Sequence, residues 1–371
     1  MFNNLHYLFE MHTMKRFTDP VLVSILNKMR KLNGCKLTEE EWKAVVDTRI
    51  DATTIQADPD KFEAETSGWY ESCYLWSVVS MACYSRARAS AKRERQLLLI
   101  AQAVDFCEQV NNLQPGSADL YKKMLQVPSV ATTGRLPGIA CLHIGMRIRL
   151  TTQILPPWAV QDASGTIMEI ELSSADRRRI EFNSGVHPSG EFNLAELPTA
   201  LYVKLDGCEH EFLPPIPCEE HRLVGYSSQC HSCRLLAGWI LIEPITRQWT
   251  FVDPDSNASL SVKRSQLPIM PAAACPLYSL QGATCDPGLI AHFVMPRRAD
   301  DDIKWLIVYV MLSRVRSLSS LKSTHLNPKI RDIIESGPPA MVAENFEKLF
   351  RTKIQLTHDA AASAKTALGW Q

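Results

Sequence analysis

The chain has 371 residues, of which 46% are hydrophobic and 22% are charged, a composition typical of two or three folded domains and not of a disordered chain. Its 40 basic residues balance its 40 acidic residues, which excludes a globally basic nucleic-acid binder and restricts any basic surface to a local patch. The 11 cysteines are an odd number scattered along a long chain, a pattern that argues against a secreted disulfide scaffold.

Neither a secretory signal nor a membrane span is evident in the sequence. The first residues, MFNNLHYLFEMHTMKRF, lack a basic segment followed by an apolar core. The longest apolar run, WLIVYVML (305–312), is too short to cross a bilayer. We therefore expect an intracellular protein, nuclear or cytoplasmic, that is not secreted and has no membrane partner.

Two helices are predicted near the N-terminus. The first runs from Pro20 to Gly34, because Asp19 is suited to the N-cap and Pro20 to the first helical turn. The second begins at the capping box Thr38 to Glu41. The apolar face of the first helix consists of Leu22, Ile25, Leu26, Met29 and Leu32.

Residues 69–110 have a helical pattern, in which the apolar stretch YLWSVVSMA (74–82) is also compatible with a buried strand. The basic run RARASAKRERQ (86–96) follows it. Such a run is usually the solvated face of a helix, and the alternative is a surface that tracks phosphates.

The pattern changes at Leu136, where short alternating apolar and polar stretches predict strands separated by turns. Examples are CLHIGMRIRLTT (141–152) and ALYVKLDG (200–207). We expect residues 136–265 to form a small β-barrel or sandwich. Two further helices are expected in the tail, one beginning at Asn327-Pro328 and one after Pro338-Pro339, the second burying Met341, Phe346, Leu349 and Phe350.

One connection of this β-rich region has the sequence CEEHRLVGYSSQCHSC (218–233). Cys218 and His221 form one pair with two residues between them, and Cys230 and Cys233 form another, the spacing with which tight turns present ligands to tetrahedral zinc. Four ligands suit a closed structural site. Other candidate ligands lie nearby at Cys208, His210 and His231, and the alternative is a metal-free loop of a cysteine-rich chain.

A second candidate site is the helix that ends in Ser313-Arg314-Val315-Arg316. Asp300-Asp301-Asp302 are suited to its N-terminus. Arginines in a last turn are common and favourable to the helix dipole. The alternative is that Arg314 is a fixed guanidinium directed at a phosphate, which its planar donors suit.

The surrounding residues resemble the C-terminal half of RecD/PIF-type superfamily 1 DNA helicases. That family has a "QLPL…T-I-H-K-S-Q-G-x-T-L-D" segment followed by "Y-V-A-L-S-R-V". Matching residues in this chain are Gln266-Leu267-Pro268, Gln281-Gly282, Thr284, Asp286, Tyr309-Val310 and Leu312-Ser313-Arg314-Val315. Segments 141–172 and 15–42 are similar to the strands of the family's SH3-like domain and to the helices after its "R-Q/R-F" motif.

The resemblance implies a role for each matched residue. Arg314 and Arg16 would be the catalytic arginines that contact the terminal phosphate of ATP. A second group would couple ATP-driven motion to single-stranded DNA, which is tracked through backbone contacts and stacking. This group is Tyr278, Gln281, Gly282, Thr284, Asp286, Ser313 and Arg316.

Two features depart from the family. The family's His-Lys-Ser is Tyr278-Ser279-Leu280 in this chain. No glycine in the sequence is followed by lysine, so the loop GxxxxGK[ST] that cradles nucleotide phosphates is not found in it. The chain begins where the family's first motor domain ends, so ATP and Mg²⁺ would bind only with a complementary nucleotide-binding domain.

These observations predict an α/β fold: a second RecA-like motor domain interrupted by a small SH3-like β-barrel module, with an N-terminal helical segment. The expected divisions are residues 1–50 (helical segment), 69–135 and 266–353 (motor domain), 136–265 (β-rich module) and 354–371 (tail). The expected function is that of the C-terminal portion of an ATP-dependent DNA helicase, inactive in isolation, with single-stranded or forked DNA as partner. The alternative is a non-enzymatic nucleic-acid-binding or scaffold remnant.

Overall fold

The structure is a computed structural model, and it describes residues 16–51, 59–110, 117–182, 190–208, 216–227, 229–280 and 282–368. The chain divides into two compact units. Unit 1 consists of residues 1–74 and 276–371, and unit 2 consists of residues 75–275. Among the described residues, no helix is both long and apolar enough to cross a membrane.

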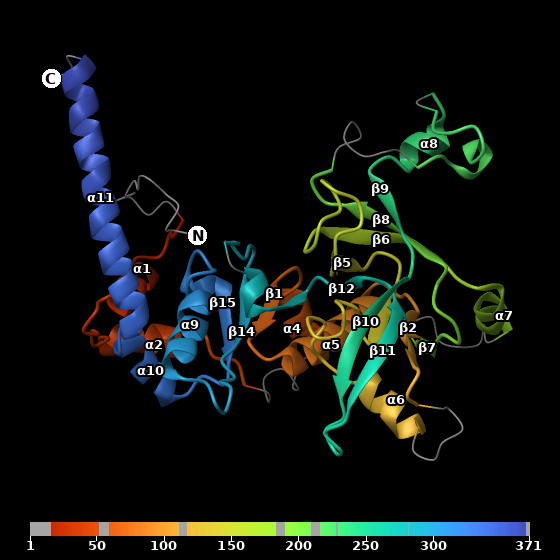
Figure 1. Ribbon diagram of the computed structural model, residues 1–371, viewed down its shortest axis with the longest axis horizontal. Helices are drawn as coiled ribbons and strands as arrows, with labels where there is room; N and C mark the ends of the chain where they lie inside the picture. Colours follow the sequence, from red (N-terminus) through yellow and green to blue (C-terminus); the bar gives the residue numbers. More distant parts are fainter. Residues whose placement is uncertain are drawn as a thin grey trace. The chain divides into compact units, whose positions relative to one another are not determined.

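Unit 1 is built around a parallel sheet in which β14 lies between β1 and β15 (Figure 1). Helix α1 packs against α2, α9 and α10. The helices and strands of unit 1 are α1 (Pro20–Met29), α2 (Glu39–Val46), α4 (Pro59–Glu65), β1 (Tyr70–Cys73), η3 (Leu277–Leu280), β14 (Leu289–His292), α9 (Asp301–Leu312), η4 (Leu318–Ser320), β15 (Leu321–Thr324), α10 (Pro328–Glu335) and α11 (Ala340–Leu368).

The caps of these helices follow from local sequence. Asp19 accepts hydrogen bonds from the backbone N–H groups of Val21 and Leu22, and Pro20 stands in the first turn of α1. The predicted capping box between Thr38 and Glu41 is present at α2. Helix α1 ends at Met29 and not at Gly34, and therefore Leu32 is 47% exposed while the rest of the predicted apolar face is fully buried.

The tail predictions are confirmed in part. Asn327 caps α10 through the backbone N–H of Lys329, with Pro328 in the first turn. Helix α11 begins after Pro339 and continues without a break to Leu368. The four side chains expected to be buried by this helix lie outside the described residues.

Unit 2 contains three sheets and the helices that cover them. One sheet has the order β12-β5-β6-β8-β9, one has the order β4-β2-β7, and one has the order β10-β11-β3. Its helices and strands are α5 (Trp76–Arg93), β2 (Leu98–Gln102), β3 (Val104–Cys107), α6 (Ser117–Leu125), β4 (Ile139–Leu142), β5 (Arg147–Leu150), β6 (Ser164–Glu171), α7 (Ser174–Phe182), β7 (Glu191–Asn193), β8 (Ala200–Leu205), η2 (Glu219–His221), α8 (His231–Leu235), β9 (Trp239–Ile242), β10 (Ile245–Val252), β11 (Ser259–Gln266) and β12 (Ile269–Pro271). The last strand, β13 (Ala274–Pro276), crosses the boundary between the units.

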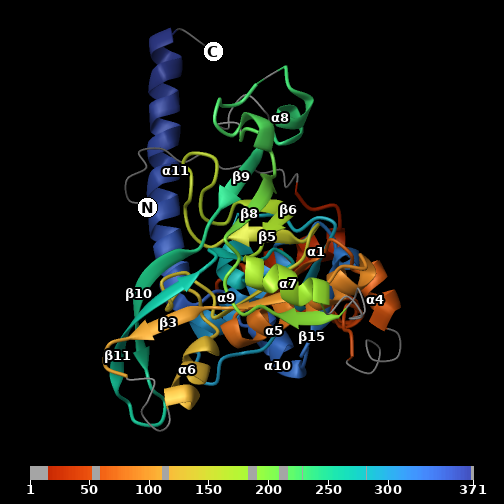
Figure 2. The ribbon, with the colours of Figure 1, turned by 90° about the vertical axis from the view of Figure 1, so that its right-hand side faces the viewer.

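The five-stranded sheet and the β4-β2-β7 sheet share one apolar core, to which Leu99, Leu142, Ile148 and Leu201 contribute. Helix α6 lies beside the β10-β11-β3 sheet (Figure 2). The two form a separate core around Trp249, Phe251 and Met124. Arg264 is buried there, paired with Asp105 at 2.6 Å and held over the Trp249 ring. This pairing satisfies a charge that would otherwise be expensive to bury.

The mixed α/β class with a parallel sheet is confirmed, but the closed SH3-like barrel is not shown. Within the part of the chain that the structure describes, every sheet of unit 2 is open. Strands β10 and β11 form a separate sheet and not part of the predicted barrel, because β11 pairs with β10 on one side and with β3 on the other. Strand β3 comes from a segment predicted to be helical. The stretch around YLWSVVSMA is helix α5 and not a strand, while residues 70–73 before it form β1.

Candidate phosphate and metal sites

Arg314 follows the last turn of α9 and its guanidinium is folded back onto the chain. Helix α9 begins after Asp300, as the three aspartates in the sequence indicated. Asp300 Oδ1 accepts a hydrogen bond from the backbone N–H of Ile303, with an N–O distance of 2.8 Å. The Arg314 Nη1 group donates to the carbonyl oxygens of Leu280 (3.2 Å) and Ala283 (3.3 Å). Its Nη2 group donates to Ser313 Oγ at 2.9 Å. The end of α9 is thereby connected to the loop that follows η3.

Arg16 reaches the same loop from the other end of the sequence. Its Nε and Nη2 groups donate to Thr284 Oγ1 at 2.9 and 2.7 Å, and Nη2 also donates to the carbonyl oxygen of Ala283. The two guanidinium groups therefore share one carbonyl oxygen. In the described residues, neither group contacts a carboxylate, so their charges are not neutralised by an ion pair.

The pKa of Arg314 reflects its burial and its position beside a second positive charge. Burial lowers the pKa of its guanidinium, and the positive charge of Arg16 lowers it further. Two like charges held together favour an anion between or beside them, since an anion relieves both the repulsion and the desolvation. The arrangement is chemically suited to a phosphate group.

The remaining residues of the predicted coupling group lie around this loop, with one exception. Gly282 adopts a φ of +85° with open space where a Cβ would stand, a conformation that glycine adopts readily. Asp286 and Arg316 approach each other at 3.9 Å on the surface. Gln281 lies outside the described residues.

Tyr278 is 57% exposed on the short helix η3. Its ring lies 5.8 Å from the ring of Tyr74, at a tilt of 57°. The hydrogen bond with Tyr74, together with burial, raises the pKa of Tyr278 to about 12, so the phenol stays neutral near pH 7. An exposed neutral ring beside a second ring is suited to stacking on a base.

The Cys/His pairs lie in the connection between the adjacent antiparallel strands β8 and β9. Cys218 and His221 are held by the turn at η2, and Cys230 and Cys233 by the start of α8. Their ligand atoms all lie within 4.8 Å of one another. The structure thus brings together the four residues that the spacing predicted.

The distances within this cluster fit one tetrahedral ion. Cys218 Sγ lies 3.3 Å from His221 Nδ1, 3.5 Å from Cys233 Sγ and 3.8 Å from Cys230 Sγ. Ligands bound to zinc at about 2.3 Å for sulfur and about 2.0 Å for nitrogen lie about 3.5–3.8 Å apart in a tetrahedron. The three distances from Cys218 Sγ are therefore close to those that tetrahedral zinc requires, and all four donor atoms lie within 4.8 Å of one another.

The thiols of the cluster have shifted acidities. Burial raises the pKa of the Cys218 thiol, and the thiols of Cys233 and Cys230 raise it further, against a backbone hydrogen bond to His221. At Cys233 burial also acts upward, but the backbone N–H groups of Cys218 and Ser227 and the neighbouring thiols bring its pKa below the usual value. Of these two thiols, Cys233 is therefore the one that is more readily deprotonated.

Some features of both sites have no signal in the sequence. Arg16 and Arg314 share the carbonyl oxygen of Ala283. An alanine side chain gives no sign in the sequence that its backbone carbonyl will accept these hydrogen bonds. Tyr74, the partner of Tyr278, lies in a stretch that reads as helix. Of the spare ligand candidates, Cys208 and His231 are outside the cluster that the structure forms, and His210 is outside the described residues.

Comparisons with known proteins give a likeness of fold. No family model matches the sequence, and no curated protein matches it. The Pif1 helicase from Bacteroides in complex with ADP-AlF3 and single-stranded DNA is similar, with a TM-score of 0.50 and 15% identity over 94% of this chain and 57% of that one. Pif1 from Candida albicans has a TM-score of 0.47 and 15% identity, over 91% of this chain and 60% of that one.

The chain thus spans less than two thirds of the length of these helicases. Both identities are low, so the likeness concerns the fold alone. It covers 94% of the present sequence. Over this length, the chain is similar in fold to part of the Bacteroides Pif1 helicase.

Proposed function

We propose that this chain acts as the C-terminal portion of an ATP-dependent DNA helicase, in which movement along single-stranded DNA is driven by ATP hydrolysis. The observation that carries the proposal is the pair of guanidinium groups, Arg16 and Arg314, that meet at Ala283 without a carboxylate among the described residues. A transferring phosphoryl group develops charge on its outer oxygens, and fixed arginines stabilise that charge. Arg314 and Arg16 are the catalytic residues of the proposal.

The nucleotide itself requires a second binding surface. The 371 residues contain no GxxxxGK[ST] loop, so a first motor domain must supply the phosphate cradle and the Mg²⁺ ligands. The Bacteroides Pif1 helicase was solved with ADP-AlF3, in agreement with a nucleotide site in the full-length relative. We therefore expect ATP and Mg²⁺ to act on this chain only when such a domain is present.

Single-stranded DNA is the proposed polymer substrate. The exposed ring of Tyr278 would stack on a base, and Arg316 would contact a phosphate beside the loop of Gly282 and Thr284. Ser313, at the end of α9, would hold the side chain of Arg314 in place by accepting its hydrogen bond. Asp286, in the loop, would link the loop to the residues after α9 because it approaches Arg316. In support, the Bacteroides Pif1 helicase was solved in complex with single-stranded DNA, and Pif1 helicases are described as unwinding DNA at forked double-stranded DNA.

A structural zinc ion is proposed at Cys218, His221, Cys230 and Cys233. The donor atoms fit a closed tetrahedral site, which leaves no open position for catalysis. Its role is to hold the long connection between β8 and β9 in one conformation. The proposed organisation remains a RecA-like second motor domain (69–135 and 266–353) with an inserted SH3-like module (136–265).

The test of DNA binding is a titration of labelled oligothymidylate by fluorescence anisotropy at several salt concentrations. Tyr278→Ala is expected to weaken binding by about 1–3 kcal/mol, the usual contribution of stacking one base, while Tyr278→Phe retains near-normal affinity because it keeps the ring. Arg316→Ala should reduce the salt slope by about 0.7 if it removes one phosphate contact.

The control for charge is Lys329→Ala, an exposed lysine at the start of α10 that has no proposed DNA contact. It should leave both affinity and slope unchanged. An absence of binding at low salt, or equal affinities for the Tyr278→Ala and Tyr278→Phe variants, would contradict the proposed DNA contact.

A second candidate function is a non-enzymatic nucleic-acid-binding or scaffold protein that retains the helicase fold. The favouring observation is Leu280, which stands where the resembled family has serine. Its side chain is buried and its carbonyl oxygen accepts from Arg314, so this position serves packing. The two functions differ in ATP hydrolysis after the nucleotide-binding domain is supplied.

A further inference from the structure

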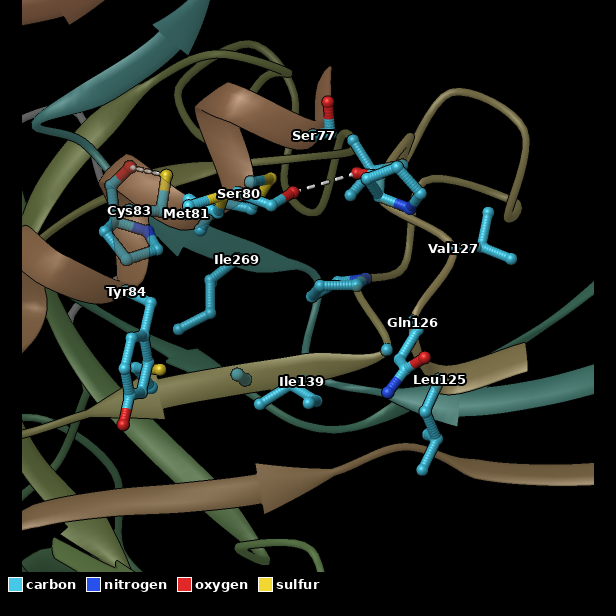
Figure 3. Close-up of a pocket in the computed structure, with 18 residues that line it drawn as sticks. Ser77, Ser80, Met81, Cys83, Tyr84, Leu125, Gln126, Val127, Ile139 and Ile269 are labelled. Atoms are coloured by element: carbon cyan, nitrogen blue, oxygen red, sulfur yellow. Dashed lines mark hydrogen bonds between the residues drawn. The ribbon is translucent and has the colours of Figure 1, made fainter. Parts of the chain in front are cut away.

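Unit 2 contains a pocket of about 450 Å³ that neither candidate site uses (Figure 3). Four segments close around it: helix α5, the chain after α6, the start of β4, and β12. Its volume is within the range of about 300–1,000 Å³ that is usual for small-molecule sites. The pocket is therefore large enough to hold an organic molecule.

The lining is uncharged. None of the 18 residues drawn around the pocket in Figure 3 is acidic, basic or a histidine. Most of its wall is hydrocarbon from Met81, Leu125, Val127, Ile139 and Ile269. A charged ligand would lose hydration here without an oppositely charged partner, which disfavours nucleotides and other phosphates as occupants.

The two thiols that line the pocket, Cys83 and Cys141, are also uncharged near pH 7. Cys83 donates to the carbonyl oxygens of Ala274 at 3.4 Å and Pro271 at 3.8 Å. Burial raises the pKa of the Cys141 thiol to about 12, so Cys141 is also neutral near pH 7. No group that lines the pocket presents a charge to an occupant.

The walls are fixed by backbone contacts. Gly138 lies so close to α6 that a Cβ at this position would stand 2.0 Å from the carbonyl oxygen of Leu125. Ser80 on α5 donates to the carbonyl oxygen of Pro128 at 3.1 Å, which joins the helix to the opposite wall (Figure 3). The pocket is therefore preformed and does not need a rearrangement to open.

Polar groups are few and lie where they can orient a ligand. Ser77 and Gln126 are exposed members of the lining, and each can both donate and accept. Among the described strands, β4 and β12 are edge strands of their sheets, so one side of each is not paired with a further strand there. A neutral ligand with one or two hydrogen-bonding groups would find partners here.

Large apolar side chains remain exposed around the pocket. Met81 is 71% exposed and Ile139 is 44% exposed, although both belong to its lining. Exposed apolar surface that is gathered around a cavity marks a binding site more often than surface that is scattered singly. Met81 also has the flexibility to adapt to the shape of an occupant.

We propose that this pocket binds a small, uncharged, mainly apolar organic molecule bearing one or two hydrogen-bonding groups, held between α5, β4 and β12. The site is separate from the residues proposed to contact DNA, ATP or zinc. All of the residues that line the pocket belong to unit 2, and this proposal does not depend on whether the chain is a helicase.

The test uses the neutral dye N-phenyl-1-naphthylamine, whose fluorescence rises in an apolar environment. Wild-type protein should show saturable binding of about one dye per chain. Met81→Glu should weaken the affinity by about tenfold or more, because it places a charge beside apolar walls. Ala140→Phe should abolish binding, because its ring fills the pocket.

The control is Val104→Glu, which introduces the same charge at a residue of β3 that is exposed but does not line the pocket. It should bind the dye as wild type does. Thermal unfolding of each variant establishes that it is folded, and if Ala140→Phe does not fold, Met81→Trp is the second pocket-filling variant.

Absence of saturable binding, or equal dye affinity in folded Met81→Glu and Val104→Glu proteins, would overturn the assignment. Oligothymidylate binding by the Met81→Glu protein is measured in parallel and should match that of wild type.

Discussion

At the scale of the single residue, Glu41 shows how one buried carboxylate joins two helices of unit 1. It accepts from Lys28 on α1 at 2.6 Å, from Ser24 at 2.6 Å and from the backbone N–H of Thr38 at 2.7 Å. Burial would raise the pKa of Glu41, but these partners, above all Lys28 and Ser24, lower it to about 2. Its negative charge is therefore stabilised by folding.

The pH dependence of stability follows from that shift. Since the pKa of Glu41 in the folded state is lower than about 4.3 in the unfolded chain, its contribution is complete above that value and is lost as the pH falls toward 2. We predict that Glu41→Gln lowers the free energy of unfolding by about 1–2 kcal/mol at pH 7. The difference from wild type should shrink between pH 5 and about pH 2.

Denaturant titrations at pH 7 and at acidic pH measure this difference. Glu40→Gln is the matched control, since Glu40 is an exposed neighbour on the same helix. A Glu41→Gln penalty that stays constant with pH, or one that Glu40→Gln reproduces, would argue against the ion pair as its cause.

At the scale of the element, the connection between β8 and β9 contains the Cys/His cluster proposed to bind zinc. Such a long connection has little core of its own, so the proposed metal cross-link would supply much of its order. We predict that purified protein contains about one equivalent of zinc, and that Cys230→Ser/Cys233→Ser loses it and unfolds at a lower temperature. Metal analysis and thermal unfolding measure both effects.

Cys208→Ser is the control for the zinc prediction, because Cys208 is near in sequence but outside the cluster. Its metal content and unfolding temperature should equal those of wild type. Less than half an equivalent of zinc in the wild type, or unchanged metal in the double variant, would exclude the structural zinc.

Elements that carry local signals could be predicted from the sequence, and those that depend on distant partners could not. Asp19, Thr38 and Asp300 mark helix starts correctly because capping is a contact between residues close in sequence. The strand β3 reads as part of a helical region because its pairing with β11 joins residues far apart. The Cys/His cluster was predictable from spacing, whereas the meeting of Arg16 and Arg314 needed a family resemblance.

At the scale of the whole molecule, the arginine pair connects two ends of unit 1 that are distant in sequence. Arg16 lies before α1 and Arg314 lies after α9, and both donate to the carbonyl oxygen of Ala283. A phosphate that drew either guanidinium away would release one contact of the loop that holds the proposed DNA residues. The proposed nucleotide and DNA contacts would thereby share one short segment of the chain.

The last prediction concerns ATP hydrolysis by the 371-residue polypeptide. We expect no hydrolysis above background by this polypeptide alone, with or without single-stranded DNA, because its sequence contains no phosphate-cradling GxxxxGK[ST] loop. Fusion to a nucleotide-binding first motor domain should produce DNA-stimulated hydrolysis, and Arg314→Ala should reduce it by a factor on the order of 10³ or more.

Lys329→Ala in the same fusion should leave the rate unchanged, since Lys329 is exposed and has no proposed contact with nucleotide. A fusion that binds DNA but shows no hydrolysis would favour the non-enzymatic function, and DNA-stimulated hydrolysis by the polypeptide alone that Arg314→Ala abolishes would refute the need for a second domain.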